Sequence, residues 1–234
     1  MPDVRTREER IPLSSGESMP ALLAEPEGRP RGAALVINDV FGRSPFYENL
    51  TRRLAVAGFV AADPEYFFRE GPLAEQTREA AMERRQRHDQ AGAVEDLAAA
   101  LTWLRSAASV AGRMGTIGFC MGGTYALQLA GRRDDLAPVC FYGFPGNLAA
   151  EERERIHGPV LGFWGDQDAG VGMDKVEELK RTLGGRGVDH EFTVYPGLGH
   201  GFMKNSALEP GGEAYDQACE AWTRTLDFYR RHLG

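Results

Sequence analysis

Short apolar runs alternate with amphipathic segments along most of the chain. Continuous apolar runs of a few residues are typical of strands buried on both faces of a parallel sheet. We predict such strands at residues 33–37, 59–62, 114–118, 136–142, 160–164 and 191–195. Residues 5–25 instead alternate polar and apolar positions around Ser14-Ser15-Gly16, which predicts an N-terminal hairpin.

The segments between these runs carry apolar residues at helical spacing, as in Val94, Leu97 and Leu101. We predict helices at residues 45–57, 75–88, 94–104, 124–130, 173–183 and 213–232. Ser44-Pro45 predicts one helix start, with the serine as the cap and proline at the first position. The alternation predicts an α/β fold in one domain, residues 1–234, with helices on both faces of a mostly parallel sheet.

Composition and charge narrow the class of protein. The chain has 234 residues, 42% of them hydrophobic, which is enough for a large core and argues against global disorder. The formal net charge of −7 disfavours nucleic-acid binding, which usually requires a basic surface. No apolar run is long enough to cross a bilayer, and the first ten residues have no apolar signal core. We therefore expect a cytoplasmic protein without a membrane segment.

The segment Gly118-Phe119-Cys120-Met121-Gly122-Gly123 has the form G-x-C-x-G-G. It lies between a predicted strand and a predicted helix. A nucleophile elbow requires this context, because the nucleophile sits on a sharp turn that only small neighbours allow to close. The three cysteines are odd in number and far apart, which argues against a disulfide framework and a metal site. The sequence therefore predicts that Cys120 is a nucleophile.

Two further reactive residue types follow predicted strands. Asp168 follows the strand at 160–164, and His200 follows the strand at 191–195. In a parallel sheet the carboxyl ends of the strands meet at one edge, so we expect Cys120, Asp168 and His200 to lie together there. The order nucleophile, acid, histidine is that of an α/β-hydrolase triad. Asp166, two residues earlier, remains an alternative for the acid.

Each residue type suits a step of acyl transfer. A thiolate is the nucleophilic form of cysteine, and the start of the following helix favours the anion. His200 takes the thiol proton and returns it to the leaving group, and a carboxylate fixes the histidine tautomer. We expect the N–H groups of Met121 and Val40 to form the oxyanion hole.

These motifs resemble those of the dienelactone hydrolase (carboxymethylenebutenolidase) family over nearly the whole chain. The family elbow G-[FY]-C-x-G-G matches residues 118–123, its aspartate loop matches Gly165-Asp166-Gln167-Asp168, and its histidine loop matches His200-Gly201-Phe202. The resemblance implies an α/β-hydrolase fold, Asp168 as the acid, and hydrolysis of a small ester or lactone without cofactor or metal.

The family also implies residues that activate the thiol and bind an anionic group. Asp39 stands where the family has a glutamate that contacts the thiol and takes its proton when substrate arrives. Arg78 aligns with one carboxylate-binding arginine, and Lys204 replaces the other. Aromatic pocket residues of the family are replaced by Met82 and Arg85.

These replacements predict the same chemistry on a substrate that need not be dienelactone. A broad-specificity esterase or thioesterase is the first alternative. A non-catalytic protein with a reactive thiol is the second.

Overall fold

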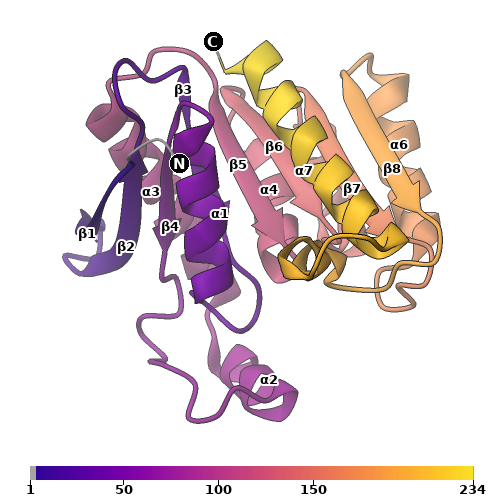
Figure 1. The fold of residues 1–234 in the computed structure, drawn as a ribbon, viewed down its shortest axis with the longest axis horizontal. Coiled ribbons are helices and arrows are strands. Elements are labelled where there is room, and N and C mark those ends of the chain that lie inside the picture. The colour runs from indigo at the N-terminus through magenta and orange to yellow at the C-terminus, as the bar shows by residue number, and fades with distance from the viewer. Residues whose placement is uncertain (1–3, 234) are drawn as a thin grey trace.

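Eight strands form a single sheet in the order β1-β2-β4-β3-β5-β6-β7-β8 (Figure 1). The computed structural model describes residues 4–233. The strands are β1 (Arg5–Pro12), β2 (Ser18–Glu25), β3 (Gly32–Ile37), β4 (Phe59–Pro64), β5 (Met114–Phe119), β6 (Leu136–Phe141), β7 (Val160–Gly165) and β8 (His190–Tyr195). β1 and β2 are antiparallel to their neighbours, and all other pairs are parallel. The predicted α/β-hydrolase fold, with its mostly parallel sheet, is confirmed.

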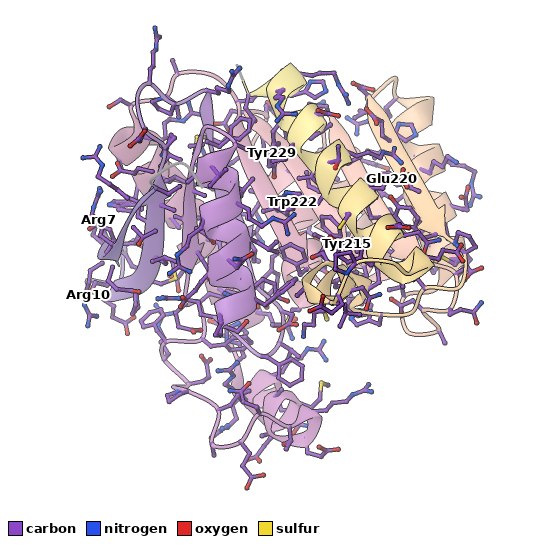
Figure 2. All side chains as sticks on the ribbon, viewed as in Figure 1. Arg7, Arg10, Tyr215, Glu220, Trp222 and Tyr229 are labelled. Carbon is purple, nitrogen blue, oxygen red and sulfur yellow. The ribbon has the colours of Figure 1, made fainter. Side chains whose placement is uncertain are left out.

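The five central strands are buried along their whole length, as their apolar sequences predict. The predicted N-terminal hairpin is β1–β2, in which Arg5 lies opposite Glu25 and Pro12 opposite Ser18. β1 is an edge strand whose exposed charged side chains include Arg7 and Arg10 (Figure 2). Such charges disfavour pairing of the open edge with another chain.

Helices cover both faces of the sheet, with α1 and α7 in front and α3 and α4 behind in the view of Figure 1. The helices are α1 (Pro45–Val56), α2 (Arg78–Arg87), α3 (Gln90–Ala108), α4 (Met121–Ala130), α5 (Ala150–Glu154), α6 (Met173–Gly185) and α7 (Glu213–His232), with 3-10 turns η1 (Pro145–Asn147) and η2 (Phe202–Ala207). Within residues 4–233, no helix is both long and apolar enough to span a bilayer.

The structure corrects several predicted boundaries. α2 begins at Arg78 instead of residue 75, because Thr77 caps it by accepting a hydrogen bond from the Ala80 N–H at 3.3 Å. α4 begins at Met121 instead of residue 124, directly after Cys120. Ser44 occupies the cap position of α1, as predicted, with Pro45 at the first helical position. Its hydroxyl makes no capping hydrogen bond, so the prediction that the serine side chain caps the helix is wrong. α5, η1 and η2 are too short to produce a periodic signal and were not predicted.

The loops after β3, β5, β7 and β8 share the carboxyl edge of the sheet, since these strands are parallel. α2 extends beyond this edge (Figure 1). The edge therefore brings together chain segments that are distant in sequence.

Candidate active site

Cys120 occupies a strained turn between β5 and α4. Its backbone angles are φ 56° and ψ −118°, a region that L residues rarely adopt. Glycines make the turn possible. A Cβ at Gly118 would lie 2.0 Å from the Gly122 carbonyl oxygen, and a Cβ at Gly122 would lie 2.2 Å from that of Ile37. The turn is also held by the Cys120 N–H, which donates to the Phe141 carbonyl at 3.0 Å.

His200 and Asp168 form a short pair across two loops. The Nδ1 atom of His200 lies 2.6 Å from Oδ2 of Asp168. The Asp168 carboxylate is buried, and its Oδ1 accepts a hydrogen bond from the Gly170 N–H at 3.2 Å. Asp166, the alternative acid, instead accepts from the Gly197 N–H at 2.8 Å. The structure thus pairs His200 with Asp168, and Nε2 is the ring nitrogen left for another partner.

Cys120, His200 and Asp168 line one pocket of about 1050 Å³. Every other residue predicted for the site also lines it, namely Asp39, Val40, Arg78, Met121 and Lys204. The aromatic rings of Tyr142 and Phe144 lie 5.0 and 5.5 Å from the imidazole of His200 and form one wall. The linear motifs therefore converge on a single cavity.

The two amides predicted for the oxyanion hole both border this pocket. Within residues 4–233, neither the Met121 N–H nor the Val40 N–H donates a hydrogen bond to an oxygen atom. Arg84 anchors the loop that contains Val40, because its Nη2 donates a hydrogen bond to the Val40 carbonyl at 2.9 Å. The buried guanidinium of Arg84 also lies 3.9 Å from the ring centroid of Phe67.

Asp39 is directed to Lys204 and to its own loop. Its Oδ2 lies 3.2 Å from Nζ of Lys204, and its Oδ1 accepts a hydrogen bond from the Phe41 N–H at 2.9 Å. The Lys204 ammonium lies 5.2 Å from the centroid of the Phe41 ring. Asp39, predicted to activate the thiol, and Lys204, predicted to bind an anionic group, therefore pair with each other.

The Cys120 thiol is a weak acid in this environment. Burial, followed by the negative charge of Asp39, raises its pKa to about 12. The Met121 N–H and the guanidinium of Arg85 act in the opposite direction, but they do not outweigh burial. The Met121 amide, at the start of α4, thus lowers the pKa of the thiol in the direction that the sequence predicted. The thiol is nevertheless protonated near neutral pH, because its pKa remains about 12.

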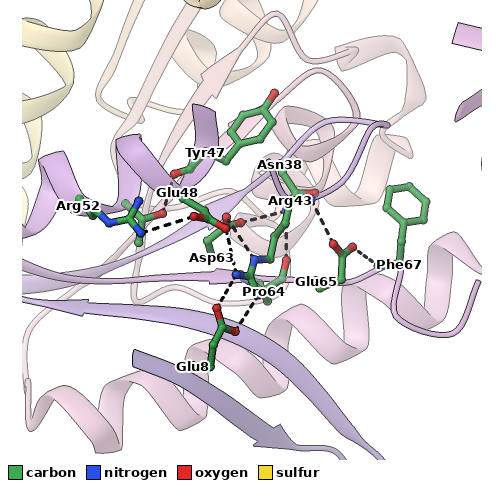
Figure 3. Close-up of polar contacts among 11 residues, drawn as sticks. Glu8, Asn38, Arg43, Tyr47, Glu48, Arg52, Asp63, Pro64, Glu65 and Phe67 are labelled. Atoms are coloured by element: carbon green, nitrogen blue, oxygen red, sulfur yellow. Dashed lines mark hydrogen bonds and ion pairs between the residues drawn. The ribbon is translucent and has the colours of Figure 1, made fainter. Parts of the chain in front are cut away.

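A buried polar cluster supports the loop that carries Asp39 and Val40 (Figure 3). The Asn38 side chain donates to Oδ1 of Asp63 at 3.0 Å and to the Pro64 carbonyl at 3.2 Å. Arg43 lies at the rim of the cluster, with its Nε 3.9 Å from Oδ2 of Asp63. Burial raises the pKa of Asp63 to about 8. The carboxyl ends of β3 and β4 are thereby held together at Asn38, the residue that precedes Asp39.

Arg85, Tyr142 and Phe144 are among the pocket residues to which the sequence assigned no role. Arg85 lines the cavity, although the sequence indicated only that an aromatic residue was missing there. Its spacing of seven residues from Arg78 was the available signal, because such residues share a helix face. Tyr142 has a positive φ of 39°, and its ring and that of Phe144, two residues later, lie near the imidazole of His200. The sequence carries no signal for this backbone conformation or for these contacts.

The mostly parallel eight-stranded sheet and the sharp strand–turn–helix at Cys120 together are the features of one class of protein, the α/β-hydrolases. The protein is an α/β-hydrolase. The sequence model described as the dienelactone hydrolase family matches residues 19–233. The chain belongs to the dienelactone hydrolase family, and is a hydrolase of that family.

Named relatives and solved structures agree with this membership. The chain is 28% identical over 226 residues to a carboxymethylenebutenolidase from Rhodococcus opacus, covering 93% of this chain and 88% of the relative. It is similar to the crystal structure of a "Putative Dienelactone Hydrolase" from Klebsiella pneumoniae, with a TM-score of 0.85 and 27% identity. That match covers 98% of this chain and 100% of the other. The dienelactone hydrolase structure from Anabaena variabilis, at 19% identity and a TM-score of 0.74 with 99% of both chains covered, shares the fold.

Proposed function

We propose that the protein hydrolyses small esters or lactones through Cys120, His200 and Asp168, by way of an acyl-thioester. One observation carries this proposal. The strained Cys120 turn and the 2.6 Å pair of His200 and Asp168 line the same pocket. A nucleophile, a base and an orienting acid within one cavity are the groups that covalent acyl transfer requires.

The first half of the reaction acylates the thiol. Nδ1 of His200 donates to Asp168, so Nε2 accepts the proton of Cys120 while sulfur bonds to the substrate carbonyl carbon. The carbonyl oxygen becomes an oxyanion held by the Met121 and Val40 amides. The carbon–oxygen ester bond then breaks, and the leaving oxygen takes the proton from His200. In a lactone this oxygen remains attached to the acyl chain.

The second half releases the product. Nε2 of His200 takes a proton from water, and the resulting hydroxide equivalent attacks the thioester carbon. The carbon–sulfur bond breaks, and the proton held by His200 returns to the thiolate. The cycle ends with a carboxylic acid product and a protonated Cys120, the resting state that a thiol pKa of about 12 favours.

Asp39 and Lys204 belong to the activation step of this proposal. A protonated thiol reacts slowly until a nearby group removes its proton. Lys204 holds the Asp39 carboxylate at 3.2 Å, and Asp39 lines the pocket with Cys120. We assign Asp39 the role of a second proton acceptor that acts once substrate loosens its pair with Lys204.

The rival functions make different use of the same site. A broad esterase or thioesterase would use identical machinery, and differs only in the range of acyl groups accepted. A redox-sensing thiol usually has a lowered pKa and an accessible thiolate. The raised pKa of Cys120 argues against that alternative.

The test is the hydrolysis of dienelactone and nitrophenyl esters by wild type and Cys120→Ala. We expect the variant to lose at least about 10³-fold in kcat, since the nucleophile is absent. Mass spectrometry of quenched reactions should show an acyl group on Cys120 in the wild type only. Cys219→Ala, on α7 and outside the pocket, is the matched control. Retained turnover in Cys120→Ala, with unchanged thermal unfolding, would disprove the proposal.

A further inference from the structure

The end of β4 buries a carboxyl group that takes no part in the reaction steps described above. Asp63 has no exposed surface, and its Oδ1 accepts a hydrogen bond from Nδ2 of Asn38 at 3.0 Å (Figure 3). Asn38 is equally buried and also donates to the Pro64 carbonyl at 3.2 Å. It directly precedes Asp39 and Val40, so the buried pair joins the end of β4 to the loop of the predicted oxyanion hole.

This loop lies directly against the turn at Cys120. A Cβ at Gly122 would lie 2.4 Å from the Asn38 carbonyl oxygen, so the start of α4 and the start of the loop are in contact. The hydroxyl of Tyr66 donates to the same carbonyl at 2.9 Å. Since Val40 closely follows Asn38 in the chain, a displacement of Asn38 moves the Val40 N–H relative to Cys120.

Three atoms of the buried cluster have complementary needs. Among the described residues, Oδ1 of Asn38, Oδ2 of Asp63 and Nε of Arg43 are buried without a hydrogen-bond partner. The Asn38 oxygen can only accept a hydrogen bond, and the Arg43 nitrogen can only donate one. A protonated Asp63 can donate from Oδ2 to the Asn38 oxygen, which completes a ring of two hydrogen bonds. An ionised Asp63 instead attracts Nε of Arg43, which lies 3.9 Å from Oδ2.

The same carboxyl group therefore acts on both ends of the loop. Asn38 begins the segment after β3, and Arg43 lies near its end, before α1. Protonation of Asp63 strengthens the attachment at Asn38, and ionisation strengthens the one at Arg43. Val40 lies between these two points, so its position depends on which attachment is the stronger.

Charged groups from four segments surround Asp63. Arg43 belongs to the loop after β3, Glu65 follows β4, Glu48 lies on α1, and Glu8 on β1 binds Arg43 at 2.8 and 3.0 Å. Burial raises the pKa of Asp63 to about 8, and the charges of Glu65 and Glu48 act in the same direction. The hydrogen bond to Oδ1 and the guanidinium of Arg43 act in the opposite direction. Near neutral pH the carboxyl group therefore keeps its proton.

We propose that Asp63 is a positioning residue of the reaction: its protonated carboxyl group fixes Asn38, and thereby the Val40 amide at the oxyanion, and its ionisation loosens that hold. The inference rests on the proposed function and deepens it. In the part of the chain that the structure describes, Asp63 does not line the pocket, so it acts through Asn38 and not on the substrate. Small displacements suffice, because a hydrogen bond weakens steeply away from its optimal geometry.

The first experiment measures kcat and KM for nitrophenyl acetate at pH 6, where wild-type Asp63 is protonated. We expect Asp63→Leu to lower kcat at least about tenfold with little change in KM, because the oxyanion forms only in the transition state. Asp63→Asn should keep kcat within about threefold of wild type, since its carboxamide can exchange two hydrogen bonds with Asn38. Asp134→Asn, at an exposed position, is the control. Equal kcat values for Asp63→Leu and wild type would overturn the proposal.

The second experiment uses only the isosteric variant Asp63→Asn and follows kcat from pH 6 to pH 9.5. The ratio of variant to wild-type kcat cancels groups that titrate in both proteins, such as His200. We expect this ratio to rise at least about threefold, with a midpoint near pH 8, because only the wild type loses the proton of Asp63. A packing defect alone would give the same ratio at every pH. A constant ratio would therefore contradict the positioning role.

A third experiment detects the loop without ester hydrolysis. In protein labelled with ¹⁵N-valine, the NMR resonance of the Val40 amide is assigned by its loss in Val40→Ile. We expect this resonance to shift with a midpoint near pH 8 in wild type and to lose that step in Asp63→Asn. If the step is present while the wild type hydrolyses no ester, the positioning of the loop stands and the proposed function fails. If esters are hydrolysed and neither the resonance nor the kcat ratio shows the step, the positioning role alone fails.

Discussion

At the scale of single residues, the environment of one sulfur atom dominates the site. Burial and Asp39 raise the pKa of the Cys120 thiol to about 12, while the Met121 amide and Arg85 lower it. A buried carboxylate beside a thiol disfavours a second negative charge there. The Cys120 thiol therefore rests in its protonated form, and its deprotonation is coupled to substrate binding in our proposal.

Replacing the neighbouring charge should make the thiol more acidic. In Asp39→Asn the anion next to Cys120 is removed and Lys204 loses its partner, and both changes favour the thiolate. We expect the thiol pKa to fall by about one unit, and alkylation by iodoacetamide at pH 8 to become about tenfold faster. The pH dependence of alkylation in a Cys219→Ser background measures this. Asp174→Asn, at an exposed position on α6, is the control, and an unchanged or slower reaction would contradict the assignment.

At the scale of elements, the β5–α4 turn depends on close approach of backbones. Gly118 and Gly122 allow α4 to begin immediately after the strained Cys120, against the end of β3. No side chain can replace a hydrogen at these two positions without moving the backbone, because the obstructing atoms are carbonyl oxygens. The geometry of the turn at Cys120 is thus a property of the whole strand–turn–helix unit.

This dependence predicts a large effect of a single methyl group. Gly118→Ala would place its Cβ 2.0 Å from the Gly122 oxygen, so the turn must open. We expect a loss of about 2–4 kcal/mol in the free energy of unfolding, measured by urea denaturation. Gly199→Ala is the control, since a Cβ there would meet no atom within 4 Å. Equal denaturation midpoints for Gly118→Ala and wild type would refute the steric argument.

At the scale of the whole molecule, the sheet encloses a titratable group in its interior. Asp63 is fully buried at the end of β4, hydrogen-bonded to Asn38 of the adjacent segment, and its pKa is raised to about 8 (Figure 3). The folded protein then keeps a proton that the unfolded chain releases near pH 4. The stabilising effect is complete below that pH and is lost as the pH rises toward about 8.

The pH profile of stability should reveal this group. Asp63→Asn keeps an acceptor for Asn38 but cannot ionise, so its stability should fall less between pH 5 and pH 8 than that of wild type. The expected difference is several kcal/mol, since one pKa unit corresponds to about 1.4 kcal/mol. Urea denaturation at several pH values measures it, with the exposed Asp134→Asn as control. Parallel profiles for wild type and Asp63→Asn would show that Asp63 ionises normally.

The fold could be predicted because its signals are local. The fully buried strands appear as continuous apolar runs, and the glycines around Cys120 mark the turn. The position of Cys120, Asp168 and His200 after the ends of parallel strands predicts that they are neighbours, and all three line one pocket. Their catalytic roles stay a prediction for the variants above to test.

Other features of the site depend on contacts between distant segments. The choice between Asp166 and Asp168 is decided by which carboxylate reaches His200, 32 residues away from Asp168. The pairing of Asp39 with Lys204, the pKa of the thiol and the place of Arg85 in the pocket follow from burial and from distances in space. None of these has a periodic or local signature in the chain.

By itself, then, the sequence determined the alternation of strands and helices, the elbow and the order of the reactive residues. These follow from hydrophobic spacing and from the conformational freedom of glycine, which act over a few neighbouring residues. Only the tertiary structure decided which charges compensate each other, which cations face the cavity and whether the thiol is ionised. Electrostatic energies depend on distance and desolvation in three dimensions, which exist only once the chain is folded.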